Sequence, residues 1–340
     1  MSRTPYRVWI SEIMLQQTQV ATVIPYFNRF MARFPDIATL AGAAPEDVMA
    51  HWAGLGYYAR ARNLHGTAIR ILNEFGGHFP ETIESLESLP GIGRSTAGAI
   101  ASLGMGQWAP ILDGNVKRVL CRHVGIEGWP GETTVTRRLW KLSESLTPQH
   151  RPADYNQAMM DLGATVCVKR QPECMRCPLQ TDCIAHQMDK TAQIPAAKPA
   201  KLKPVRHCFM LVLLNGDRNV WLETRPPSGI WGGLRCLPEF DSLDDVQVWG
   251  IQQGITMAAF RQLPMRRHSF SHYDLDYTPL ILSSSGLATP TKIADSGWYS
   301  MVNPGGLPTP VRRLLQDISR SFQNGDLPET GLTTEKGSGL

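Results

Sequence analysis

The apolar residues in the first part of this chain follow a helical period. Trp9, Ile10, Ile13 and Met14 recur at the spacing of one helix face, and Glu12 falls on another face. Breaks rich in glycine or proline divide this part further, at positions 34–35, 76–77, 90–91 and 130–131. The pattern predicts a mostly helical domain over residues 1–190.

The pattern changes after residue 204. Apolar runs at 208–214, 220–224 and 275–282 predict strands, and Asn215-Gly216 predicts a turn between the first two. Residues 309–322 have the period of an amphipathic helix. A second domain, of α+β type, is therefore expected over residues 205–322.

Two segments lack any apolar period. Residues 191–204 contain three prolines and three lysines, which predicts an extended, solvated linker. Residues 323–340 are polar and glycine-rich, which predicts a disordered tail. The pentapeptide at 327–331, Leu-Pro-Glu-Thr-Gly, matches a cell-wall sorting signal. Because no hydrophobic segment follows it, we interpret it as a chance match or an appended remnant.

Composition narrows the class of protein. The chain has 340 residues, of which 42% are hydrophobic and 19% charged, enough for two globular domains with real cores. The net charge of +4 is compatible with a polyanionic partner without establishing one. The N-terminus lacks the apolar region of a secretory signal, and no apolar stretch has the length of a membrane helix. We therefore expect a soluble, cytoplasmic protein.

Four of the seven cysteines are grouped in the middle of the chain. Cys167, Cys174, Cys177 and Cys183 have the spacing C-x6-C-x2-C-x5-C. Structural zinc sites usually pair their cysteines as two short knuckles, and only one such pair occurs here. A four-iron cluster, also held by four thiolates, tolerates the wider outer spacings. The spacing favours an iron–sulfur cluster over zinc and leaves a disulfide framework as the third alternative.

The segment 89–97, Leu-Pro-Gly-Ile-Gly-Arg-Ser-Thr-Ala, predicts a tight glycine hairpin that leads into a helix. Gly91 and Gly93 would let the backbone approach a ligand closely, and the amides of the following helix would favour an anion such as a phosphate. An ordinary turn between helices is the alternative for a bare Gly-x-Gly. The leucine, the proline and the helical flanks favour a backbone-gripping element instead.

Two carboxylates are candidates for acid–base chemistry. Asp113 precedes an apparent helix, so it is expected to be an N-cap whose carboxylate the helix amides keep ionised. Glu12 has uncharged polar neighbours after an apolar run, and such surroundings would raise its pKa. A solvated helix face is the alternative for Glu12. Asn115, Lys117 and Arg118 add polar and basic groups beside Asp113.

The segment 54–63, Gly-Leu-Gly-Tyr-Tyr-Ala-Arg-Ala-Arg-Asn, joins two aromatic residues to two arginines. Tyr57 and Tyr58 could stack on bases, and Arg60 and Arg62 could pair with phosphates. A buried tyrosine pair beside a solvated arginine face is the alternative.

In their order along the chain, these segments resemble the helix-hairpin-helix DNA glycosylases that carry an iron–sulfur cluster, and within them the adenine glycosylase (MutY) family. The resemblance runs from about residue 4 to 186 and resumes after the linker. It implies a helical glycosylase domain over 1–190, with a six-helix part over about 1–108 and a cluster part over about 109–190. It also implies a Nudix-like (MutT-like) α+β domain over 205–322.

For the active site, the resemblance implies removal of adenine mispaired with 8-oxoguanine or guanine in double-stranded DNA, after the adenine is flipped out of the stack. Glu12 matches the general acid, Asp113 the carboxylate that stabilises the oxocarbenium-like sugar, and Asn115 a supporting residue. Gln157 matches a residue that contacts the adenine. The DNA-binding positions are Gln17 and Tyr57 as wedges in the stack, together with Leu89, Gly91, Gly93, Ser95 and Lys117. The four cysteines match the ligands of a 4Fe-4S cluster.

One position separates this family from its close relatives. Enzymes of the endonuclease III type carry a lysine after the hairpin glycines that forms a Schiff base with the sugar. Ser95 occupies that position here, which predicts a monofunctional glycosylase. The alternatives are an endonuclease III-like lyase, a non-catalytic cluster-containing DNA-binding protein and a zinc-dependent binding module.

In the second domain, residues 225–233 match the segment that opens a Nudix motif, and Gly233 to Glu239 keeps its spacing. The acidic residues that hold magnesium in a Nudix hydrolase are missing from residues 247–252, so this domain is expected to bind and not to hydrolyse. Phe270, Ser271 and His272 match the loop that recognises 8-oxoguanine; a polar loop between strands is the alternative.

The family also has an N-terminal segment with a Leu-Pro-Trp motif, and this sequence starts after it. We therefore expect an N-terminally shortened member with reduced activity. We further expect a monomer without a membrane partner, associated with the bacterial nucleoid through DNA.

Overall fold

The structure is a computed structural model. It describes residues 4–199, 202–226, 229–255, 260–283, 290, 295–302 and 304–324. The chain divides into two compact units, residues 1–48 with 59–200 and residues 49–58 with 201–340. Each unit is described by itself.

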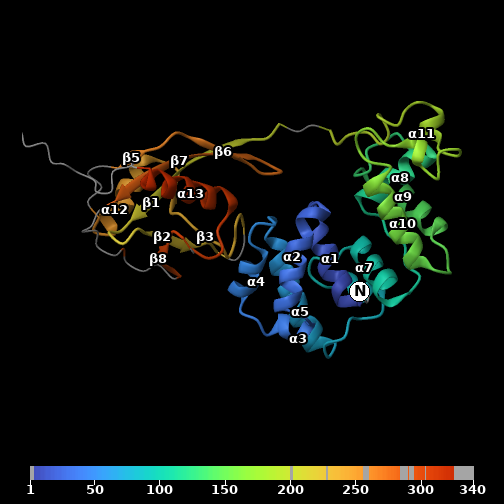
Figure 1. The fold of residues 1–340 in the computed structure, drawn as a ribbon, viewed down its shortest axis with the longest axis horizontal. Helices are drawn as coiled ribbons and strands as arrows, with labels where there is room; N and C mark the ends of the chain where they lie inside the picture. Colours follow the sequence, from blue (N-terminus) through green and yellow to red (C-terminus); the bar gives the residue numbers. More distant parts are fainter. Residues whose placement is uncertain are drawn as a thin grey trace, which may run out of the picture. The chain divides into compact units, whose positions relative to one another are not determined.

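The first part of the chain is helical, as the apolar period predicted (Figure 1). Its helices are α1 (Pro5–Leu15), α2 (Val20–Arg33), α3 (Ile37–Ala41), α4 (Pro45–Trp52), α5 (Ala59–Glu74), α6 (Ile83–Glu87), α7 (Arg94–Ala99), α8 (Gly114–Val124), α9 (Thr133–Leu146), α10 (Pro152–Thr165) and α11 (Ile184–Gln187). A π-helix η1 (Ile100–Gly104) continues α7, and a 3-10 turn η2 (Cys174–Arg176) lies among the cysteines.

Helix α1 is the centre of this unit. Trp9, Ile10 and Met14 are fully buried, and the Trp9 ring meets the edge of Phe79 at 5.5 Å. Thr4 caps the helix by accepting a hydrogen bond from the Arg7 amide, and proline follows at the first helical position. Burial of the face that carries Trp9 fixes the rotation of α1 about its own axis, and Glu12 lies on a different face of the helix.

Segment 191–204 differs from its prediction in its first part. Ile194 is only 2% exposed, and its carbonyl accepts a hydrogen bond from Arg122 Nε at 2.9 Å. The Ala196 amide also donates to the Glu127 carbonyl. Residues 194–196 are therefore packed against the helical unit and are not solvated linker, because an apolar isoleucine and a buried arginine outweigh the local polarity.

In the second part of the chain, the described residues form an eight-stranded mixed sheet with two helices (Figure 1). The strands are β1 (Val205–Leu214), β2 (Asn219–Thr224), β3 (Arg235–Cys236), β4 (Glu239–Phe240), β5 (Arg261–Gln262), β6 (Arg266–Ser269), β7 (Asp274–Ser283) and β8 (Ser296–Ser300); the helices are α12 (Leu243–Gln252) and α13 (Thr309–Gln323). The order β3-β2-β1-β7-β5 places a parallel β1–β7 pair at the centre, with Val205 opposite Asp274.

The three predicted strands and the closing helix are confirmed. Five consecutive residues at the end of β1 are buried, as expected of a central strand covered on both faces. Leu211 and Leu213 face a core that includes Val246 and Trp249 of α12. The predicted tail lies outside the described residues from position 325 onward, and so does the pentapeptide within it.

Candidate active site, cysteine cavity and hairpin loop

One cavity of about 910 Å³ in the helical unit brings together four of the predicted site residues. Glu12 comes from α1, Asp113 and Asn115 from the start of α8, and Gln157 from α10. These positions are up to 145 residues apart in sequence, from 12 to 157. These four side chains place two carboxylates and two amides in the wall of one pocket.

Glu12 has the raised pKa that its surroundings predicted. Burial among protein atoms and, second, the neighbouring charge of Asp113 together raise the pKa to about 7. A carboxyl group with this pKa is half protonated near neutrality, so it can donate a proton there.

Asp113 is the N-cap of α8, as predicted, and its Oδ1 accepts a hydrogen bond from the Val116 amide at 2.8 Å. The amides at the start of α8 lower the pKa of Asp113, but they do not set its net direction. Burial raises the pKa of Asp113 by more than those amides and the cations of Arg118 and Lys117 lower it. Burial thus raises the pKa of both carboxyl groups, and at Asp113 the helix amides offset part of this effect.

Arg118 links the N-terminal end of α8 to the segment that carries the cysteines. Its guanidinium donates to Asn115 Oδ1 at 2.8 Å, to the Gly163 carbonyl at 2.6 Å and to the Cys167 carbonyl at 2.7 Å. Helix α10 lies so close to α8 here that a Cβ added at Gly163 would be 2.6 Å from the Asn115 Cβ. The orientation of Asn115 therefore depends on all three segments.

Gln157 has a partner that sequence reasoning missed. Its Nε2 donates to Asp161 Oδ1 at 2.9 Å, and Asp161 lines the same cavity. Because the amide nitrogen is held by Asp161, this bond sets the orientation of the Gln157 amide in the cavity. The four-residue spacing on one helix was the available signal.

Gln17 and Tyr57, the predicted wedges, both have left-handed backbone conformations, with φ of 56° and 50°. Gln17 is exposed, and the Tyr57 side chain is 49% exposed. Residues other than glycine adopt such angles at a cost of about 1–3 kcal/mol and cluster at functional sites.

Arg60 does not have the phosphate-pairing role that its sequence context suggested. It is buried, and its guanidinium donates to the carbonyls of Ile13, Met14 and Gln16 at 2.7–2.8 Å. It therefore caps the C-terminus of α1 and holds the segment that carries Gln17. Of the tyrosine pair, Tyr58 is buried and Tyr57 is not.

The predicted hairpin joins α6 to α7. Gly91 has φ of 78°, and a Cβ there would lie 2.9 Å from Asn63 Cβ, so the turn requires glycine. Leu89 is buried beneath the turn, and Gly93 is the N-cap of α7. Ser95 Oγ accepts a hydrogen bond from the Leu112 amide at 3.0 Å, directly before Asp113.

The four grouped cysteines line one small cavity. Cys167 follows the end of α10, Cys174 begins η2, Cys177 directly follows η2, and Cys183 is the N-cap of α11. Arg122 donates to Cys167 Sγ at 3.3 Å, and the Cys183 thiol donates to the Arg122 carbonyl at 3.5 Å. Within the described ranges, no three His, Cys, Asp or Glu side chains are arranged to hold one metal ion.

Of the predicted DNA-binding positions not yet described, Lys117 is half-buried on α8.

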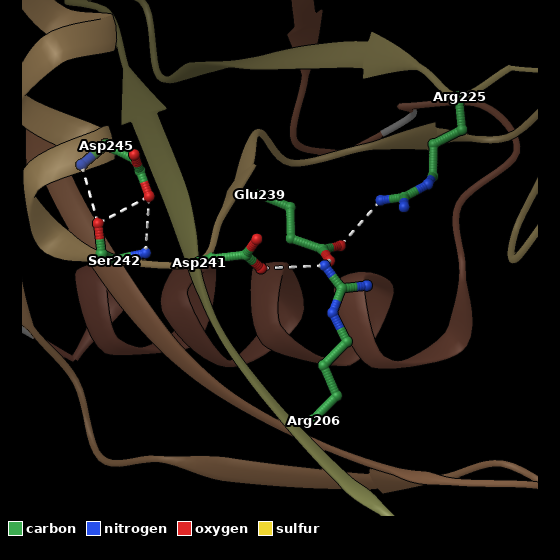
Figure 2. Close-up of polar contacts among 6 residues, drawn as sticks. All are labelled: Arg206, Arg225, Glu239, Asp241, Ser242 and Asp245. Atoms are coloured by element: carbon green, nitrogen blue, oxygen red, sulfur yellow. Dashed lines mark hydrogen bonds and ion pairs between the residues drawn. The ribbon is translucent and has the colours of Figure 1, made fainter.

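In the second unit, Phe270, Ser271 and His272 lie in the hairpin between β6 and β7, where Ser269 pairs with Asp274. The Phe270 amide donates to the Tyr273 carbonyl at 2.9 Å and closes the turn. Figure 2 shows that Glu239 lies between Arg206 and Arg225, with ion pairs of 2.9 and 2.8 Å. On α12, Asp245 caps the helix with Ser242 instead of facing a metal.

Comparison with known families agrees with this architecture. Residues 10–145 match the HhH-GPD superfamily of base excision DNA repair proteins, and residues 209–317 match the NUDIX domain. The structure of a thermostable thymine-DNA glycosylase, 27% identical, superposes with a TM-score of 0.51 over 55% of this chain and 86% of that chain. The fold and the site define a helix-hairpin-helix base-excision DNA glycosylase joined to a Nudix-like domain.

Individual relatives show which family of DNA glycosylases the chain belongs to. The adenine DNA glycosylase of Buchnera aphidicola from Acyrthosiphon pisum is 38% identical over 94% of this chain and 92% of its own length. The human adenine DNA glycosylase is 49% identical over 58% of this chain and 36% of its own. The chain belongs to the adenine DNA glycosylase family of DNA repair enzymes, which act on N-glycosyl bonds. Among the described residues, no helix is both long and apolar enough to cross a membrane.

Proposed function

We propose that this protein removes adenine mispaired with 8-oxoguanine or guanine in double-stranded DNA, by hydrolysis of the N-glycosidic bond. The observation that carries the proposal is the pairing of Glu12, whose pKa is about 7, with Asp113 in one cavity. Two desolvated carboxylates on the wall of one pocket suit the paired-carboxylate logic of glycoside hydrolysis.

In the proposed reaction, the adenine leaves the base stack and enters the cavity. Protonated Glu12 donates its proton to the adenine ring, which makes the base a better leaving group. Asp113, held by the Val116 amide, stabilises the positive charge that develops on the sugar as the bond to adenine breaks. A water molecule then adds to that sugar carbon and gives up a proton, which completes the hydrolysis. Asn115 supports this arrangement, and the Gln157 amide oxygen, fixed by Asp161, accepts from the exocyclic amine of adenine.

The DNA backbone would be held by the hairpin of Leu89, Gly91 and Gly93, whose turn exposes the amides at the start of α7 to a phosphate. Lys117 adds a cation near Asp113. Gln17 and Tyr57 are proposed to enter the base stack, and their strained backbone angles support such a use.

The reaction is proposed to stop at base removal. A lyase needs an amine nucleophile at the hairpin, and Ser95 instead accepts a hydrogen bond from the Leu112 amide. This bond makes Ser95 a positioning residue of the hairpin. The endonuclease III-like alternative therefore lacks its nucleophile at that position.

Cys167, Cys174, Cys177 and Cys183 are proposed to hold a 4Fe-4S cluster. Four thiols around a common cavity supply the four thiolate ligands that such a cluster needs. When bound, the cluster would supply a rigid crosslink between α10, η2 and α11. Through Cys167, Arg118 would orient Asn115 from that crosslinked segment.

The second unit is proposed to recognise 8-oxoguanine through Phe270, Ser271 and His272, without hydrolysis. In α12 the only acidic residues are Asp244 and Asp245 in the first turn, so this helix lacks the acidic face of a magnesium site. We further propose a monomer that works in the cytoplasm, because its DNA substrate is there.

The test is a single-turnover assay on duplexes with A opposite 8-oxoguanine, G, C or T, each analysed with and without alkali. Excision from the first two only, with strand cleavage only after alkali, is the expected result. A nick formed without alkali and trapped by borohydride would favour the lyase. Adenine release that survives the Glu12→Gln substitution would contradict the general-acid role and leave a DNA-binding cluster protein as the second candidate.

A further inference from the structure

The hairpin of Phe270, Ser271 and His272 stands on a cluster of aromatic rings. The Phe270 ring stacks on Tyr273 at 4.6 Å with an interplanar angle of 22°, and it meets His268 edge-on at 4.6 Å. Trp231, which comes from a different segment, contacts Phe270 at 5.3 Å and His268 at 5.9 Å. Phe270 is thus held on several sides, whereas Ser271 and His272 are exposed.

Trp231 adopts a backbone conformation that a bulky residue rarely takes. Its φ is 57°, and Gly229 and Gly233 on either side have φ of 88° and 75°. Its side chain is only 8% exposed. Such a backbone conformation is retained only where surrounding contacts hold it in place. Here it directs the indole ring toward Phe270 of the hairpin.

The loop that carries Trp231 is fixed at both ends. The Gly233 amide donates to the Arg225 carbonyl at 3.1 Å, and the Arg225 amide donates to the Leu234 carbonyl at 3.0 Å. The Arg225 guanidinium lies 5.9 Å from the Trp231 ring and donates to Glu239 Oε2 at 2.8 Å (Figure 2). Glu239, whose side chain is 9% exposed, is itself held by Arg206. The glutamate that opens a Nudix motif thus anchors this loop through an arginine.

We propose that Trp231, anchored through Arg225 and Glu239, is a positioning residue that sets discrimination between 8-oxoguanine and guanine opposite adenine. This inference rests on the proposed function of the hairpin. The two bases differ only at C8 and N7, so a hydrogen-bonding group must be placed to within a fraction of an ångström to tell them apart. Ser271 and His272 keep that placement while Phe270 is fixed. Trp231 contacts the Phe270 ring from outside the hairpin, whereas Lys203 bonds only to the Phe270 carbonyl.

The test compares three variants of the full-length protein with the wild type. Trp231→Leu removes the ring contacts, and Trp231→Phe retains an aromatic ring. Trp298→Leu is the matched control, since Trp298 packs in the core of the same unit against Trp221 at 5.5 Å, outside this ring cluster. The measured quantity is the ratio of single-turnover adenine excision rates on A:8-oxoguanine and A:G duplexes, with the thermal transition of each variant.

Trp231→Leu is expected to lower this ratio by roughly tenfold, the effect of losing one or two aromatic contacts. Trp231→Phe should recover most of the ratio, and Trp298→Leu should leave it unchanged. A wild-type ratio in active Trp231→Leu protein, or an equal fall in Trp298→Leu, would overturn the inference while the proposed function stands. A wild type that releases adenine from neither duplex would overturn both.

If Trp231→Leu does not fold, Arg225→Met serves as the second variant, because it removes the guanidinium between Trp231 and Glu239. It should shift the ratio in the same direction, and an unchanged ratio would overturn the inference.

Discussion

Replacing Glu12 with glutamine should strongly slow adenine excision and, at alkaline pH, stabilise the protein. In the folded protein the pKa of Glu12 is about 7, against 4.5 for an ordinary glutamate. The folded state therefore binds the proton more tightly, and stability falls as the pH rises from about 4.5 through 7. At about 1.4 kcal/mol per pH unit, the full effect is about 3 kcal/mol of unfolding free energy.

Glutamine carries no charge at any pH, so the Glu12→Gln protein avoids this loss. The difference in unfolding free energy between variant and wild type should be near zero at pH 4.5 and rise to about 3 kcal/mol at pH 8. Urea denaturation at several pH values measures it. Glu81→Gln, at an exposed position of the same unit, is the control and should show no such trend.

Adenine excision by Glu12→Gln should fall by about 10²–10⁴, the usual contribution of a general acid. A stability difference that does not change with pH would refute the argument from burial. Retained excision would refute the general-acid role of Glu12 but would leave the argument from burial unaffected.

Three further substitutions test the surroundings of the site. Arg118→Met removes the hydrogen bonds to Asn115, Gly163 and Cys167. It should slow excision at least tenfold in single-turnover kinetics and lower the unfolding free energy by about 2–3 kcal/mol in denaturation. Wild-type kinetics would contradict the orienting role of Arg118. Gly163→Ala forces a Cβ against Asn115, so it should lower the unfolding free energy by about 1–3 kcal/mol and slow excision. An unchanged unfolding midpoint would contradict the close packing of α10 against α8. Cys174→Ala should lower iron and acid-labile sulfide together, whereas full sulfide content, or zinc in place of iron in the wild type, would argue against the proposed cluster.

Sequence patterns predicted the elements whose side chains follow one local period. The strands around Leu211, Leu222 and Leu280 are buried runs, so their apolar character alone identified them. The two-residue strands β3, β4 and β5 carry no period of their own, because they form only where the chain pairs with a longer neighbour. Their existence depends on tertiary structure.

The candidate site shows the same division. Cysteine spacing and the Asp113 cap are local features and could be read from sequence. The pKa of Asp113 could not, because it depends on how far several helices exclude water from one cavity. The functions of Arg60 and Arg118 also depend on carbonyls supplied by distant segments. Charge in a sequence does not reveal whether a guanidinium faces solvent or a helix end.

The most direct test of the central claim is the pH dependence of adenine excision from an A:8-oxoguanine duplex under single-turnover conditions. If Glu12 is the acid, the wild-type rate should fall as the pH rises above about 7, because the carboxyl group loses its proton there. The low residual rate of Glu12→Gln should not follow that titration. A wild-type rate that stays constant from about pH 6 to 9 would contradict the account.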